Sequence, residues 1–176
     1  MTDYSFVDCT IERHGEAILA IFNEAIANST ALYDYKPRTQ ESMVGWFEAK
    51  RAGNFPVIGI EDSTGLLLGF ASFGAFRPHP AYKYSVEHSV YVHHEHRGRG
   101  LGRILLTRIL EEADAFGAHV VIGAIDADNL ASLKLHEAFG FERVGTLPQV
   151  GYKFGRWLDL ALMQKTLAGP LDPTDD

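Results

Sequence analysis

Apolar residues recur every three to four positions in four segments of the chain, which is the period of an amphipathic helix. In the first segment, from His14 to about Asn28, the repeating positions are Ile18, Leu19, Ile21, Phe22, Ala25 and Ile26. A second helix is predicted from Met43 to Ala49, with Thr39 or Ser42 as its cap. The remaining predicted helices are Gly100–Phe116 and Asn129–Phe139, the latter ended by Gly140.

Shorter apolar runs bounded by turn residues predict strands. Pro56–Glu61 and Leu66–Phe76 flank the turn Asp62–Gly65 and predict an antiparallel hairpin. Val120–Ile125 is apolar throughout, which is typical of a strand buried on both faces at the centre of a sheet. The other predicted strands are Tyr4–Cys9, Tyr84–Val92, Glu142–Val150 and Trp157–Gln164.

The length and composition fit one domain of the α/β (α+β) class. With 176 residues, 46% of them hydrophobic, the chain has enough apolar material for a full core. We expect a single domain over residues 1–168, followed by a flexible acidic tail over residues 169–176. The sequence contains no repeat and no second domain boundary.

Charge and cysteine content exclude several classes of function. A net charge of −7 argues against nucleic-acid binding, which needs a basic face. No apolar stretch approaches the roughly 18 residues of a membrane span, and the N-terminal region contains no signal-peptide core. Cys9 is the only cysteine, so no internal disulfide is possible and we expect a cytoplasmic protein.

A turn rich in glycine and arginine follows the predicted strand that ends at Val92. It contains Arg97, Gly98, Arg99, Gly100, Gly102 and Arg103. The glycines allow the main chain to curl with its N–H groups pointing inward, and the following helix directs the positive end of its dipole to the same point. Because the arginines add local positive charge to an acidic chain, the turn predicts an anion site, best suited to a pyrophosphate.

The spacing of these residues distinguishes the turn from two common phosphate-binding motifs. A P-loop needs a Lys-Ser/Thr pair after its last glycine, and a dinucleotide fingerprint needs G-x-G-x-x-G; the turn has neither. Its motif Arg97-x-x-Gly100-x-Gly102 resembles the cofactor turn of the GNAT superfamily of acyl-CoA-dependent N-acetyltransferases. The predicted order of elements also resembles the GNAT fold, a mixed twisted sheet of about seven strands flanked by about four helices.

Longer segments resemble one family of that superfamily, the phosphinothricin and methionine sulfoximine N-acetyltransferases. They are Asn23–Ile26, Ser29–Ala31, Phe76–His79, Val86–Val92 and Gln149–Asp159. The resemblance implies an enzyme that uses acetyl-CoA to acetylate the amino group of a small amino acid analogue. It implies that the cofactor is held by Val90, Tyr91, Val92, Arg97, Gly98, Arg99, Gly100, Leu101, Gly102, Arg103, Asn129, Ser132 and His136. It also implies a bulge near Val90–Val92 that frees N–H groups for the acetyl carbonyl.

Glu87 is the candidate general base. Acetyl transfer needs a neutral amine, and amino groups titrate at about 8 or above, so a base has to remove a proton. Glu87 lies within an apolar strand shortly before the turn, where burial would raise its pKa. A solvent-facing glutamate on an edge strand is the alternative. The resemblance favours the base, because the family's catalytic glutamate occupies this strand position.

His136 shares one stripe of its predicted helix with Asn129, Ser132 and Leu133. The resemblance implies a catalytic role for His136, at the position where GNAT enzymes generally carry the tyrosine that protonates the leaving thiolate. Two other interpretations stay open. Asn129 and Ser132 could be a helix cap and its first turn, and His136 could be a half-buried structural histidine.

Arg77 is the first candidate for substrate recognition, because it lies at a strand end and can pair with a carboxylate or phosphinate. The resemblance places the acceptor pocket at Arg77, Pro78, His79, Glu87, His88 and Ser89. Lys153 and Arg156 are further cationic candidates, and either would also fit a surface charge. Since Cys9 lies far in sequence from the turn, no covalent intermediate is expected, and the amine attacks directly in a ternary complex.

The closing strands predict a homodimer. They carry Tyr152, Phe154, Trp157, Leu158 and Leu160, more apolar surface than a small sheet edge hides, and the family resemblance points to the same region. No metal is predicted, because His93, His94 and His96 lie in a loop without a second ligand cluster.

Two functions other than an acetyltransferase are compatible with parts of the sequence. A non-catalytic acyl-CoA-binding sensor or interaction module on the same fold would need neither Glu87 nor His136. A nucleotide-binding oxidoreductase fragment could use Asp126 as its ribose-binding acid. It would also need the full fingerprint and a second mononucleotide-binding half, which the chain lacks.

Overall fold

The computed structural model describes residues 4–175, and within them the elements follow the predicted order. The strands are β1 (Tyr4–Asp8), β2 (Val57–Asp62), β3 (Leu67–Ala75), β4 (Ser85–Val92), β5 (Val120–Asp126), β6 (Glu142–Lys153) and β7 (Arg156–Thr166). The α-helices are α1 (Ile11–Asn28), α2 (Gln40–Ala52), α3 (Leu101–Phe116) and α4 (Leu130–Ala138). Short 3₁₀ helices cover Pro80–Tyr82 and His94–His96. The seven strands form one mixed sheet in the order β1-β2-β3-β4-β5-β7-β6, which confirms the predicted fold class.

The contacts divide the chain into two compact units. The first unit comprises the residues up to Gly74 together with Ser89–Leu110. The second unit comprises Ala75–His88 and the residues from Glu111 onward. β4 and α3 therefore each run from one unit into the other. The single domain expected over residues 1–168 stays a prediction.

Side-chain caps fix where the helices of the first unit begin. The Thr10 hydroxyl accepts a hydrogen bond from the Arg13 amide at 3.3 Å, so α1 begins at Ile11, ahead of the predicted start. The Thr39 hydroxyl accepts from the Ser42 amide at 3.2 Å, and the Ser42 hydroxyl accepts from the Thr39 amide at 3.1 Å. The two alternative caps predicted for α2 thus act together in one capping box.

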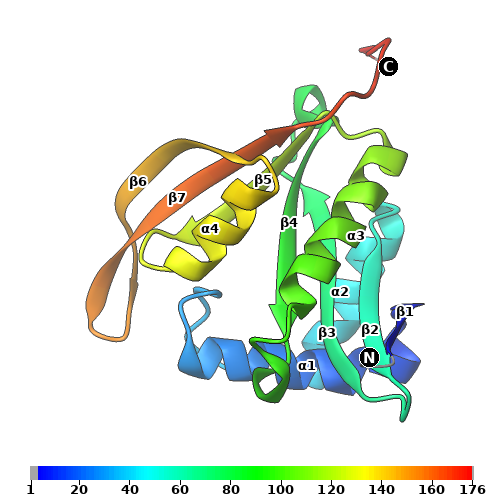
Figure 1. Ribbon diagram of the computed structural model, residues 1–176, viewed down its shortest axis with the longest axis vertical. Helices are drawn as coiled ribbons and strands as arrows, with labels where there is room; N and C mark the ends of the chain where they lie inside the picture. Colours follow the sequence, from blue (N-terminus) through cyan, green and yellow to red (C-terminus); the bar gives the residue numbers. More distant parts are fainter. Residues whose placement is uncertain (1–3, 176) are drawn as a thin grey trace. The chain divides into compact units, whose positions relative to one another are not determined.

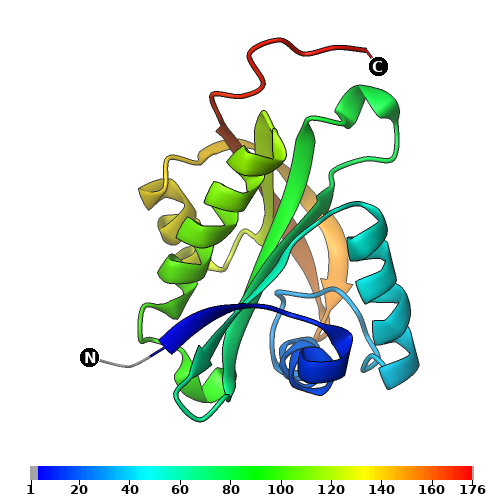
Figure 2. The same cartoon turned by 90° about the vertical axis from the view of Figure 1, so that its right-hand side faces the viewer.

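The core of the first unit lies between α1, α2 and one face of β2 and β3. Its buried cluster consists of Ile18, Ile21, Phe22, Met43, Val57, Leu67 and Phe70. The Phe22 ring makes edge-to-face contacts with Trp46, Phe70 and Tyr91, at centroid distances of 5.5, 5.1 and 5.2 Å. Figure 2 shows α1 (blue) and α2 (cyan) on one side of these strands and the start of α3 (green) on the other.

Gly69 permits the close approach that positions the end of β4. A Cβ at Gly69 would lie 2.7 Å from the carbonyl oxygen of Tyr91 and 3.1 Å from Cδ1 of Leu105 in α3. Beyond β4, the His93 amide donates to the carbonyl oxygen of Leu68 at 2.9 Å. The end of β4 is therefore closely packed against β3 and α3 in the first unit. This packing fixes where the turn before α3 begins.

β5 is the central strand of the second unit. It pairs parallel with β4 from Ser85–Val120 to Glu87–Ile122, and antiparallel with β7 along its length. β7 pairs in turn with β6 in the long hairpin visible in Figure 1. The two residues of its turn, Phe154 and Gly155, both have positive φ angles, 51° and 75°. α4 packs against β5, as its contacts show.

β6 runs beyond its predicted end at Val150 to Lys153. Its register with β7 shifts between Leu147 and Gly151. Within this irregular stretch Gln149 has a φ of 54°, and its amide donates to the carboxylate of Asp159 at 2.8 Å. The place where the sequence predicted the strand to end is therefore a bulge inside a continuing strand.

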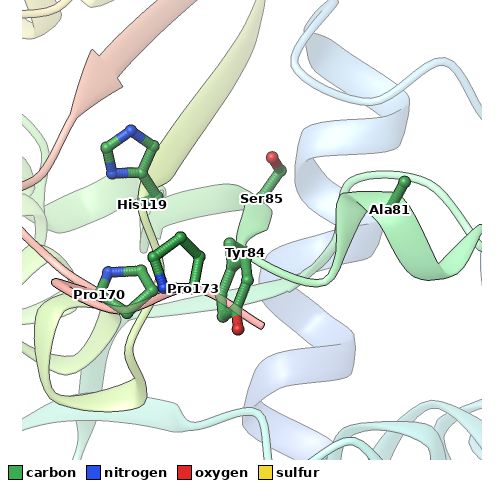
Figure 3. Close-up of a pocket in the computed structure, with 6 residues that line it drawn as sticks. All are labelled: Ala81, Tyr84, Ser85, His119, Pro170 and Pro173. Atoms are coloured by element: carbon green, nitrogen blue, oxygen red, sulfur yellow. The ribbon is translucent and has the colours of Figure 1, made fainter. Parts of the chain in front are cut away.

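The described part of the C-terminal tail contacts other residues of the second unit, to which it belongs. The carbonyl oxygen of Gly169 lies 2.8 Å from Nδ1 of His119, and the Thr174 amide donates to the Tyr84 hydroxyl at 3.0 Å. A pocket of about 250 Å³ lies here, lined by Ala81, Tyr84, Ser85, His119, Pro170 and Pro173 (Figure 3). The predicted flexibility of the tail stays a prediction. None of the described helices combines the length and hydropathy that a membrane crossing requires.

Candidate active site

The glycine-rich turn in the first unit has the curled backbone that the sequence predicts. Gly98 and Gly100 have φ angles of 77° and 80°, a region that favours glycine. A Cβ at either position would meet no atom within 4 Å. The backbone conformation itself therefore requires the glycines, since a side chain at either position would have space. Gly102 lies in the first turn of α3.

The arginines of the turn do not all point to one anion. Arg97 forms an ion pair with Glu24 of α1 and donates from Nε to the carbonyl oxygen of Val92 at 3.3 Å. Arg99 reaches back to the carbonyl oxygen of Glu95 at 3.4 Å. Arg103 is exposed on α3. Arg97 thus ties the turn to α1, a contact 73 residues distant in sequence that the motif did not indicate.

The donor set at the start of α3 fits a pyrophosphate. The first amides of an α-helix generally have no acceptor inside the helix, and the helix dipole adds positive potential at the same end. In α3 the Arg103 amide already donates to the carbonyl oxygen of Gly100 at 3.0 Å, so the amides before it are the ones that remain for an anion. The open space beside Gly98 and Gly100 leaves room for an anion to approach the main chain. Val90–Val92, which precede this turn, are half-buried. The bulge expected there stays a prediction.

Glu87 and Arg77 lie close enough in the second unit for their charges to interact. Glu87 is half-buried in β4, and burial raises the pKa of its carboxyl, while the charge of Arg77 lowers it. Arg77 is exposed in the loop closed by the hydrogen bond from the Phe76 amide to the carbonyl oxygen of Ser85, 3.1 Å. Its guanidinium lies 4.4 Å from the centroid of the Phe76 ring. The charge of the predicted anion-binding arginine therefore acts on the predicted base.

The other predicted acceptor residues are placed differently. Pro78 and His79 are exposed, and His79 precedes the 3₁₀ helix as its N-cap residue. Successive residues of a strand point to opposite faces, so His88 faces away from Glu87, and it is buried. Ser89 is half-buried in the part of β4 that belongs to the first unit.

His88 meets His136 across the second unit. Their Nε2 atoms are 3.0 Å apart and their rings are stacked, with centroids 5.0 Å apart. Nδ1 of His136 lies 2.7 Å from the carbonyl oxygen of Ser132, and the Phe141 ring packs beside both imidazoles. Burial lowers the pKa of His88 to about 3, and it also lowers the pKa of His136, against the opposing effect of the Ser132 hydrogen bond.

Asn129 and Ser132 form the cap of α4, the structural interpretation that the sequence left open. The Asn129 side-chain oxygen accepts from the Ser132 amide at 3.1 Å. Their contact with a cofactor stays a prediction. Sequence reasoning missed the contact between His88 and His136, which are 48 residues apart, because no local pattern indicates it.

The remaining cationic candidates have partners inside the second unit. Arg156 forms ion pairs with Asp128 at 2.9 Å and with Asp126 at 3.4 Å. Lys153 is buried, with its ammonium 4.9 Å from the centroid of the Phe154 ring. Asp126, which the oxidoreductase interpretation needs as a ribose acid, is buried and engaged by Arg156.

One group of possible metal ligands lies beside the glycine turn. His93, Glu95 and His96 each offer a ligand atom, and these atoms lie within 4.8 Å of one another. His93 already accepts a hydrogen bond from the Glu95 amide through Nδ1, at 3.4 Å. The expectation of no metal stays a prediction.

Comparison with known proteins identifies the family and the fold of the chain. The model of the acetyltransferase (GNAT) family matches residues 18–141. The chain is 46% identical over 157 residues, 89% of each chain, to an L-methionine sulfoximine/L-methionine sulfone acetyltransferase from Pseudomonas paraeruginosa. A solved structure from Acinetobacter baylyi ADP1 is 55% identical, with a TM-score of 0.99 over 100% of this chain and 98% of that chain. A Salmonella typhimurium protein solved with its cofactor acetyl-CoA is 38% identical, with a TM-score of 0.92 over 98% of both chains.

Proposed function

The chain belongs to the acetyltransferase (GNAT) family, and from this premise we propose that it acetylates a small amino acid analogue with acetyl-CoA. The acceptor class is an amino acid of the methionine sulfoximine, methionine sulfone or phosphinothricin type. The observation that carries the proposal is the 46% identity, over 89% of both chains, to an enzyme named for the first two of these substrates. The segments around Arg77, Glu87 and Tyr152 that resemble the phosphinothricin enzymes support the third.

Acetyl-CoA supplies an activated acetyl thioester when it is bound. The residues proposed to hold its pyrophosphate are Gly98–Arg103, where the positive φ angles of two glycines and the start of α3 present main-chain N–H groups. Val90–Val92 are proposed to hold the acetyl end, and Asn129, Ser132 and His136 the thiol end. The Salmonella typhimurium relative with acetyl-CoA supports this choice of cofactor.

Glu87 is the proposed general base. Its raised pKa, caused by burial, makes it a better proton acceptor than an exposed carboxylate. It takes one proton from the substrate ammonium group, and the neutral nitrogen forms a C–N bond to the acetyl carbon. The C–S bond breaks, the sulfur leaves with the electron pair, and the second proton on the nitrogen passes to that sulfur, so the products are the amide, the thiol of coenzyme A and protonated Glu87. Burial and nearby carboxylates raise the pKa of the Cys9 thiol to about 12, so it offers no thiolate for a covalent route.

Arg77 is proposed to bind the acid group of the substrate and, by doing so, to tune the base. In the free protein the Arg77 charge lowers the pKa of Glu87. A carboxylate or phosphinate paired with the guanidinium would offset that charge. The pKa of Glu87 would then rise further, so the base would become stronger once an anionic substrate is in place.

The oligomeric state we propose is a homodimer through the β6–β7 hairpin. Val150, Tyr152, Phe154 and Trp157 are all exposed there, and the Tyr152 and Trp157 rings contact each other at 5.1 Å between centroids. One part of the expected surface is corrected: Leu158 is fully buried, because it faces the core side of β7. The remaining exposed aromatic residues lie together on one hairpin, and clustered exposed apolar residues mark interaction sites more often than single ones do.

A thiol-release assay tests the proposed function. Acetyl-CoA is offered with a panel of methionine sulfoximine, methionine sulfone, phosphinothricin, neutral amines of similar size and a lysine peptide. We expect release with the first three, and robust acetylation of the peptide alone would contradict the substrate class. Binding of acetyl-CoA by calorimetry without turnover of any amine would instead support the non-catalytic sensor.

A further inference from the structure

The hydrogen-bond partners of His88 and His136 determine which nitrogen of each ring carries a proton. A carbonyl oxygen can only accept a hydrogen bond. Nδ1 of His136, 2.7 Å from the carbonyl oxygen of Ser132, therefore carries a proton. In a neutral imidazole the other nitrogen then has a lone pair, so Nε2 of His136 is an acceptor. Nε2 of His88, 3.0 Å away, must be the donor.

A second observation agrees with this assignment. If Nε2 of His88 carries the proton, Nδ1 of His88 has only a lone pair. Among the described residues, Nδ1 of His88 is a buried atom with no hydrogen-bond partner. The reverse assignment would bury an unpaired N–H donor there and would leave two lone pairs facing each other at 3.0 Å, which is costly in a buried site.

The surroundings favour the neutral form of both rings. Burial is the largest cause lowering the pKa of each imidazole, and for His88 the neighbouring His136 lowers it further. Gly123 of β5 makes the contact possible. A Cβ there would lie 3.2 Å from Nε2 of His88 and 3.3 Å from Cδ2 of His136, closer than ordinary side-chain contacts.

We propose that His88 is a positioning residue that donates from Nε2 to Nε2 of His136 and fixes His136 as its Nδ1–H tautomer. This inference rests on the proposed function only where it concerns turnover. In this state Nε2 of His136 has no proton to give. The resemblance implied a catalytic role for His136 at the position of the group that protonates the leaving thiolate. In this state His136 is instead an oriented imidazole whose Nε2 already accepts a hydrogen bond from His88.

Nitrogen–proton NMR correlation spectra of the labelled full-length protein at neutral pH test the tautomers without any assay of turnover. His88→Gln and His136→Gln spectra assign the signals. We expect the directly bonded proton on Nδ1 in His136 and on Nε2 in His88. A proton on Nε2 of His136, or two protons on either ring, would overturn the proposal.

Two replacements of His88 separate positioning from packing. Glutamine keeps an N–H donor at the place of Nε2, while leucine removes it and keeps an apolar body. Without the His88 donor the His136 ring is no longer held in one orientation, so we expect His88→Leu to lower kcat by about tenfold, with unchanged KM for acetyl-CoA. His88→Gln should restore most of it. Equal kcat for His88→Leu and the wild type would overturn the positioning role.

Gly123→Ala tests the contact between His88 and His136 without removing either imidazole. The added Cβ pushes on the contact, so the His136 nitrogen signals should shift and kcat should fall. Gly145→Ala, in β6 of the same unit, is the matched control, because a Cβ there meets nothing within 4 Å. Unchanged His136 signals in Gly123→Ala would contradict the proposal. If the wild type acetylates no amine, the proposed function fails, while the NMR result still decides the tautomers.

Discussion

Replacing Glu87 with glutamine removes the proposed base and keeps the shape of the side chain. Glu87 sits within the paired part of β4, opposite Ile122, so an isosteric amide can occupy the same place. Loss of a positioned base costs about 10²–10⁴ in rate, which corresponds to about 3–5 kcal/mol in the activation barrier. We expect kcat at pH 7 to fall by that factor, while the Kd for acetyl-CoA, measured by calorimetry, stays the same.

The structure also predicts the direction in which kcat of the wild type and of this variant changes with pH. Burial raises the pKa of Glu87, and Arg77 partly opposes this. Wild-type kcat should therefore fall as the pH drops through a pKa above the ordinary value of 4.5, because a protonated carboxyl cannot accept a proton. Glu87→Gln lacks this acid limb. Its deficit should shrink at high pH, where more of the amine is already neutral.

Stability measurements provide a check that does not depend on turnover. A carboxyl whose pKa is higher in the folded than in the unfolded state binds more protons when folded. Stability then falls as the pH rises through the interval between the two pKa values. The glutamine side chain of Glu87→Gln carries no charge, so the variant should have a melting temperature at or above that of the wild type at pH 7. Below pH 4, where the wild-type carboxyl is protonated, this difference in melting temperature should disappear.

Glu142→Gln, which changes an exposed carboxylate at the start of β6, is the control and should leave kcat unchanged. Near-normal kcat of Glu87→Gln at pH 7 would refute the assignment of the base. Another group or solvent would then have to accept the proton. Ping-pong kinetics would contradict direct attack independently.

Three further outcomes are expected. Gly100→Val should weaken acetyl-CoA binding in calorimetry by forcing a β-branched residue to a φ of 80°, at a cost of about 1–2 kcal/mol. Gly145→Val should not, because Gly145 has no positive φ and a Cβ there meets nothing within 4 Å; equal affinities of the two variants would remove the central role of the turn. Arg77→Ala should raise KM for anionic amines far more than for neutral ones in steady-state assays, and equal effects would refute the acid-group contact. Trp157→Glu should convert a dimer to a monomer in light scattering, because it places a charge on the exposed aromatic surface; a monomeric wild type at micromolar concentration would contradict the dimer.

Features that depend on nearby residues were predictable from the sequence. The helical period around Phe22, the capping residues Thr39 and Ser42, and the buried run of β5 all follow from interactions within a few positions along the chain. The positive φ of Gly98 and Gly100 belongs to the same class, because a tight turn is a local structure. Errors occurred at element ends such as that of β6, where the partner strand β7 decides whether pairing continues.

The sequence by itself determined the order of the elements, the glycine turn before α3 and the choice of Glu87 as a candidate base. Only the tertiary structure decided which side chains meet: Arg97 with Glu24, Glu87 with the charge of Arg77, and His88 with His136. Gly123 shows the difference most clearly. Its backbone is an ordinary strand, and a glycine is needed there only because two imidazoles from distant segments lie within contact of its missing Cβ. Local propensities act over a few residues, whereas the contact of the two imidazoles is fixed by the packing of β4, β5 and α4, so no motif could reveal it.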